Sequence, residues 1–250
     1  MRTGSLREME RRDTVRSPVQ SDLAVSLLGG FEALRNWRPV PIPMSGQRLL
    51  AYLALRGGAL PRMHVAGTLW LDAPEARAAA SLRSALWRLR QAGLPLVDAT
   101  ASHLRLAARV RVDVQDLSER AEEVLRLPRD PAAHLRALAS HGELLPGWYE
   151  DWVVMERERL RQLQLRALET LATALLAAGK PGDALEAALA AAADEPLRES
   201  AHRLVIKAHL VEGNFAEAVR QYRLFRSLIR DEPGLESPEM RQLGLSLKLS

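Results

Sequence analysis

Basic and polar residues at a spacing suited to binding another molecule are concentrated in one stretch, Ala78–Gln91. Its apolar members recur at i, i+3, i+4 and i+7, the spacing of one face of an α-helix; they are Leu82, Ala85, Leu86 and Leu89. No acidic residue occurs between Glu75 and Asp98. Arginine, hydroxyl and amide groups on an acid-free helix face suit the major groove of DNA, where they can read base edges. The polar face comprises Ser81, Arg83, Ser84, Trp87, Arg88, Arg90 and Gln91.

The stretch before this helix predicts a small antiparallel sheet. Short apolar runs at residues 23–28 and 31–34 flank Gly29-Gly30, which is a hairpin signal. Residues 40–42 lie between prolines, so they are predicted to form an edge strand. Residues 1–21 show no periodicity and many charges, and we expect a disordered tail there.

Two further helices and a hairpin complete the expected unit. One helix is predicted over residues 45–56 with Ser45 as its cap, and another over 62–70 after Pro61. Short alternating runs suited to a β-hairpin follow the arginine-rich helix, at 96–97, 103–106 and 110–114. A sheet, three helices and a hairpin in this order predict a winged helix-turn-helix, whose third helix enters the major groove and whose wing lies near the backbone.

Helical periodicity continues from residue 114 onward. Gly179 and Gly213 are 34 residues apart, as are Ala184 and Ala218. A 34-residue period with a glycine between paired helices is the tetratricopeptide signature. The helices expected are 114–127, 132–141, 153–178, 183–193, 199–212 and 215–230.

An aromatic-rich segment, residues 144–152, precedes the long helix and is predicted to act as a hinge. Its aromatic side chains favour interdomain packing over a ligand pocket; they are Trp148, Tyr149 and Trp152. The predicted fold is therefore mostly α with a small β component. It consists of the tail, a winged helix-turn-helix domain over 22–114, and an all-α tetratricopeptide-like helical repeat domain over 115–250.

Charge divides the chain in the same way. Residues 1–113 hold 17 arginines, no lysine and 9 acidic residues, whereas residues 114–250 hold 18 basic and 22 acidic residues. The basic front part has the sign needed to attract phosphate. The chain has no cysteine, no apolar run long enough to span a membrane and no signal-peptide pattern, so we expect a cytoplasmic protein without membrane contact.

Catalytic patterns are absent from the sequence. There is no G-x-x-x-x-G-K-[ST], H-E-x-x-H or G-x-S-x-G motif, and the six histidines show no ligand spacing. Glu156 and Glu158 alternate with arginines, as on a salt-bridged helix surface. We therefore expect no enzyme activity, no cofactor and no metal site.

Three segments resemble the OmpR-type winged helix of the SARP family, transcriptional activators of high-GC bacteria. They are Arg48–Leu55, Val65–Trp70 and Ser81–Arg90. Residues 114–245 resemble the bacterial transcriptional activator domain that follows this winged helix, notably in Leu145-Pro146-Gly147 and Pro196–Glu199. The chain departs from the family at Trp87, where a small polar residue is common, and in the wing, where His103–Leu106 lacks the usual aromatic residue.

The resemblance implies a sequence-specific transcriptional activator that binds direct repeats in double-stranded promoter DNA. It also implies recruitment of the RNA polymerase holoenzyme through its sigma factor, and a homodimer on DNA. The expected base-reading residues are Arg83, Ser84, Trp87 and Arg88. The expected phosphate-binding residues are Arg48, Arg62, Arg90, Arg105 and Arg109. The expected polymerase contact is the loop that includes Leu71, Asp72 and Glu75.

Two alternatives stay open at this stage. A repressor would use the same DNA contacts at a site that blocks polymerase. A helical-repeat interaction scaffold would use its winged helix mainly to bind protein. For Trp87, support of the wing from a partly buried position is as good an interpretation as a base or sugar contact.

Overall fold

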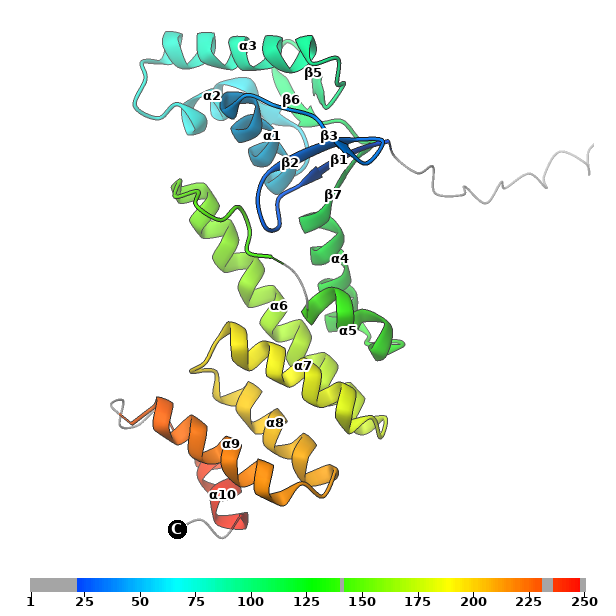
Figure 1. Ribbon diagram of the computed structural model, residues 1–250. Coiled ribbons are helices and arrows are strands. Elements are labelled where there is room, and N and C mark those ends of the chain that lie inside the picture. The colour runs from blue at the N-terminus through cyan, green and yellow to red at the C-terminus, as the bar shows by residue number, and fades with distance from the viewer. Residues whose placement is uncertain (1–21, 140–141, 231–235, 248–250) are drawn as a thin grey trace, which may run out of the picture.

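The computed structural model describes residues 22–139, 142–230 and 236–247. The tail predicted over residues 1–21 lies outside the described residues. The winged helix forms one end of an elongated molecule, and successive helices extend away from it (Figure 1). In the described residues, no helix combines the length and the apolar character needed to cross a bilayer.

The N-terminal sheet confirms the predicted hairpin. Strands β1 (Leu23–Ser26) and β2 (Glu32–Arg35) pair antiparallel around Gly29-Gly30, and β3 (Arg38–Pro39) pairs with β2. The prediction of an edge strand over 40–42 was wrong in its bounds, because β3 ends at Pro39. Prolines at 41 and 43 remove two backbone donors there, although Val40 still donates to the carbonyl of Ala33.

The helices of the winged helix lie within a few residues of their predicted bounds: α1 is Met44–Arg56, α2 is Arg62–Leu69 and α3 is Glu75–Gln91. Ser45 does not cap α1, since the N-cap is Pro43 without a side-chain hydrogen bond. The Ser45 hydroxyl instead accepts a hydrogen bond from Arg88 of α3, at 3.1 Å.

The wing is built from different strands than the sequence predicted. Strands β5 (Val97–Ala99) and β6 (His103–Leu106) form the expected hairpin, and the short β4 (Leu60–Pro61) adds to β6. The last predicted run becomes β7 (Val110–Val112), which leaves the wing and pairs parallel with β1. The alternation of buried valines in β7 fits a strand of the wing and a strand of the N-terminal sheet equally well, so the sequence pattern did not indicate which sheet β7 joins.

The remaining helices confirm the predicted repeat. Gly179 and Gly213 both take left-handed backbone angles, with φ of 70° and 77°, at the turns after α6 and α8. Ala184 and Ala218 are fully buried, which lets paired helices approach closely. The structure adds α10, which the sequence analysis did not predict. The helices are α4 (Asp113–Arg126), α5 (Pro131–Ala139), α6 (Asp151–Ala177), α7 (Pro181–Asp194), α8 (Glu199–Val211), α9 (Phe215–Leu228) and α10 (Pro238–Ser246).

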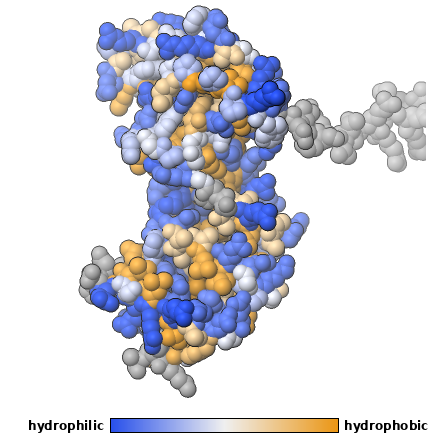
Figure 2. Space-filling model, in the orientation of Figure 1, coloured by the Kyte–Doolittle hydropathy of each residue, from blue (hydrophilic) through white to orange (hydrophobic). Residues whose placement is uncertain are grey.

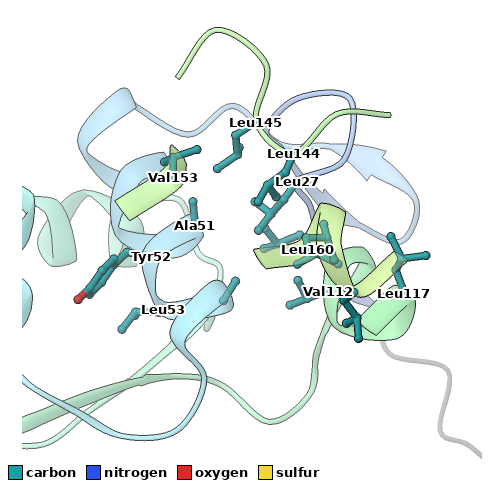
Figure 3. Close-up of a cluster of buried hydrophobic side chains, with 14 of the residues drawn as sticks. Leu27, Ala51, Tyr52, Leu53, Val112, Leu117, Leu144, Leu145, Val153 and Leu160 are labelled. Carbon is teal, nitrogen blue, oxygen red and sulfur yellow. The ribbon is translucent and has the colours of Figure 1, made fainter. Parts of the chain in front are cut away.

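One hydrophobic core runs from the winged helix into the helical part (Figure 3). Leu27 at the end of β1 lies beside Leu144 and Leu145 (Figure 3), and Leu144 forms an isolated β-bridge with Leu28. The Leu145 amide donates to the carbonyl of Leu27, at 2.8 Å. The segment predicted as a hinge is therefore docked on the N-terminal sheet, and its last two residues already belong to α6.

Aromatic side chains fill the same junction. Trp148 stacks on Phe31 with ring centroids 6.4 Å apart, and Trp152 meets Tyr52 of α1 edge-on at 5.3 Å. The prediction of interdomain packing is confirmed for these two tryptophans. It was wrong for Tyr149, which is 82% exposed. Tyr149 instead lines an open groove together with Trp70 and Met155.

Candidate DNA-binding interface

Helix α3 is held in place by its apolar face, which packs on the other helices of the winged helix. Leu82, Leu86 and Leu89 are buried, as are Ala78 and Ala85. Close approach to α1 depends on Gly46, because a Cβ there would lie 3.0 Å from Leu89 Cδ2 and 2.9 Å from Ile42 Cγ2. The opposite face of α3 is consequently fixed in orientation.

That opposite face is exposed and basic, as the sequence predicted. Arg83, Ser84, Trp87, Arg88 and Arg90 are all exposed on α3. The helix lies at the end of the molecule farthest from α7–α10 (Figure 1), and hydrophilic residues predominate there (Figure 2). Trp87 is 61% exposed, so it does not support the wing from a buried position.

The arginines of this face differ in their attachments. Arg88 donates a hydrogen bond to Ser45 of α1, whereas Arg83 and Arg90 form no ion pair with any residue that the structure describes. A guanidinium without a protein counter-charge can exchange its bound water and ions for phosphate or base acceptors. Arg83 and Arg90 are therefore more available to DNA than Arg88 is.

The wing region carries three of the expected phosphate-binding residues. Arg105 pairs with Asp98 across the hairpin at 3.0 Å, with both side chains about half exposed. Arg62 donates to the carbonyl of Thr100 and Arg109 to that of Pro95, each at 3.3 Å. These contacts anchor the guanidinium groups to the wing region.

Arg48 lies apart from this set, at the junction with the helical part. Its Nε lies 2.9 Å from Glu150 Oε1, at the junction between α1 and the segment before α6. The opposite side of α1 meets α3 through Gly46. Arg48 therefore serves the junction, because the spacing in α1 turns it toward the helical part.

The loop expected to contact polymerase borders a groove of about 970 Å³ between the two parts of the chain. Leu71 is 79% exposed and Asp72 is exposed, and both line this groove together with Tyr149 and Met155. Glu75 lies outside the loop, as the first residue of α3. An exposed apolar residue at a loop tip is available for a protein partner.

Sequence reasoning missed two features of this region. Arg77 is exposed on α3, and its spacing of seven residues from Ser84 could have placed it on the polar face. Glu156 is buried and pairs with Arg56 of α1 at 3.2 Å and with Arg159 at 2.7 Å. The alternating charges indicated ion pairs on one helix, but nothing in the sequence indicated the pair across the junction.

Comparison with known proteins agrees with this architecture. Residues 112–248 match the family model described as the bacterial transcriptional activator domain. The chain is 31% identical over 239 residues to the Regulatory protein AfsR of Streptomyces coelicolor, and 31% identical over 250 residues to that of Streptomyces griseus. These matches cover 88% and 90% of this chain, which spans only 24% of each relative.

The fold also matches a solved structure, that of Mycobacterium tuberculosis EmbR in complex with a low affinity phosphopeptide. The TM-score is 0.72 at 22% sequence identity, and the match covers 91% of this chain and 65% of EmbR. It extends over the winged helix as well as the helical part. The family model covers more than half of the chain, and the two relatives in Streptomyces are regulatory proteins: the chain belongs to the SARP family of transcriptional regulators.

Proposed function

We propose that this protein is a sequence-specific DNA-binding activator that recognises repeated sequences in a promoter. The observation that carries the proposal is the exposed face of α3, which is arginine-rich and has no acidic residue between Glu75 and Asp98. Repulsion from phosphate is therefore minimal along the whole face. The acidic helical part would be repelled by DNA, so it suits protein partners instead.

The proposed DNA contacts fall into two groups. Arg83, Ser84, Trp87 and Arg88 contact bases from α3. A bidentate contact of arginine with guanine contributes ~1–3 kcal/mol of discrimination. Phosphate contacts come from Arg90 at one edge of α3 and from three arginines of the wing region, Arg62, Arg105 and Arg109. These contacts set the register of the protein on the duplex.

Activation would follow from a contact with the RNA polymerase holoenzyme through its sigma factor. The exposed side chains of Leu71 and Asp72 form the proposed contact, with Glu75 at its edge. We further propose that a homodimer, supported by the helical part, occupies two repeats of the DNA. Both partners then bind on surfaces away from the base-reading residues of α3.

Footprinting and transcription together test this function. The full chain should protect a repeated sequence in the promoter next to its own gene, and Arg83→Ala should abolish that protection. Leu71→Ala should keep the footprint but lose activation of a reporter from the same promoter. Wild-type footprints that coincide with reduced transcription would identify a repressor, and the absence of any footprint would refute the proposal.

A further inference from the structure

Trp87 is the one large apolar side chain on the exposed face of α3. Its indole is 61% exposed, and none of the ring contacts among the described residues involves it. Trp148 and Trp152, by contrast, pack in the junction. An exposed indole on a basic face leaves a large apolar surface in water, and a bound partner would remove that cost.

Trp87 also lies near the middle of this face. At ~100° per residue, Arg83 and Arg90 lie about 40° and 60° from it on one side. Arg88 lies about 100° away on the other side. If α3 enters a major groove about 12 Å wide, Trp87 faces its floor and the longer side chains of Arg83 and Arg88 reach base edges on either side of it.

The floor of the major groove offers one apolar group that an indole can recognise, the C5-methyl of thymine. The other base-edge groups there are hydrogen-bond donors or acceptors, which the carbon edge of an indole cannot satisfy. We propose that Trp87 contacts a thymine methyl, so that each DNA repeat contains a thymine between the positions contacted by arginine. This inference rests on the proposed function and specifies its DNA partner.

Replacement of thymine by deoxyuridine tests the inference, since it removes only the methyl group. DNA is first selected from a random pool by the full chain, and each thymine of the selected site is then replaced in turn. At one position per repeat, wild-type binding should weaken about fourfold, which corresponds to ~0.8 kcal/mol for one buried carbon. Trp87→Ala should bind the two DNAs equally.

A matched control is Trp37→Ala, because Trp37 is 68% exposed in the turn between β2 and β3, away from α3. This variant should retain the full deoxyuridine effect. One outcome would refute the thymine contact while the proposed function stands. In that outcome, selection yields a defined site that Arg83→Ala no longer binds, but every deoxyuridine substitution changes the affinity of wild type and of Trp87→Ala equally. If selection yields no preferred sequence, the proposed function itself fails.

Discussion

Replacing Asp113 by alanine should loosen the junction between the winged helix and the helical part. Asp113 is the first residue of α4. Its carboxylate accepts hydrogen bonds from the backbone N–H groups of Leu27 at 2.9 and 3.0 Å, Leu28 at 3.1 Å and Val114 at 2.7 Å. It also accepts from the hydroxyl of Ser26. One side chain thus joins the end of β1 to the start of α4.

The expected magnitude follows from the number of donors left without an acceptor. Asp113→Ala removes the acceptor of three backbone N–H groups, and an unsatisfied buried donor costs ~1–3 kcal/mol. Because the site is half-buried, the low end applies, and the free energy of unfolding should fall by ~3 kcal/mol in total. Asp113→Asn keeps one acceptor oxygen, so about half of that loss is expected.

Urea unfolding followed by tryptophan fluorescence and circular dichroism measures this change. Asp116→Ala is a matched control in the same turn of α4, because Asp116 pairs with Arg111 at 2.9 Å and both side chains are about half exposed. Such a surface pair contributes less than ~1 kcal/mol. If Asp113→Ala costs no more than Asp116→Ala, Asp113 does not hold the junction.

Three further predictions concern other parts of the chain. Burial lowers the pKa of His202 from its ordinary value of 6.5, so the thermal midpoint should be constant above about pH 6.5 and fall as the pH drops below it. His202→Gln should flatten this pH dependence of the midpoint. An equal slope in both proteins would count against His202 as its cause. Gly213→Ala should lower the free energy of unfolding, measured in urea, by ~1–2 kcal/mol because φ is +77° at Gly213. Gly67→Ala in α2 should instead raise the free energy of unfolding by up to ~1 kcal/mol, because an added Cβ there meets nothing within 4 Å. Effects of the same sign would contradict this. Arg90→Ala should reduce the slope of log K against log salt for DNA binding by about one, and an unchanged slope would remove Arg90 from the phosphate contacts.

Local patterns predicted most of the elements because each depends on neighbouring residues. The apolar face of α3 follows from leucines at helical spacing, and it is buried as expected. The repeat was predicted from glycines and alanines 34 residues apart, whose left-handed turns and burial the structure confirms. These signals lie within a single helix or helix pair.

Tertiary partners were harder to predict, since they depend on residues far apart in the chain. Val110 and Val112 fit either sheet by alternation, and only their parallel pairing with β1 decides between them. Arg48 pairs with Glu150, about a hundred positions away, a partner that its spacing in α1 did not indicate. Charge and spacing identified the candidate face of α3, but they could not assign each arginine to DNA or to protein.

Fluorescence anisotropy of selected and scrambled DNA across a salt series tests whether α3 reads the bases. The wild-type protein is compared with Arg83→Ala and with Arg126→Ala. Arg126→Ala is the control, because Arg126 is exposed on α4 and its replacement removes the same charge at a position away from α3. The account predicts that Arg83→Ala loses ~1–3 kcal/mol of preference for the selected DNA while salt-sensitive binding to scrambled DNA survives. It also predicts that Arg126→Ala resembles wild type. Equal loss in both variants, or undiminished preference in Arg83→Ala, would contradict the claim that α3 reads the bases.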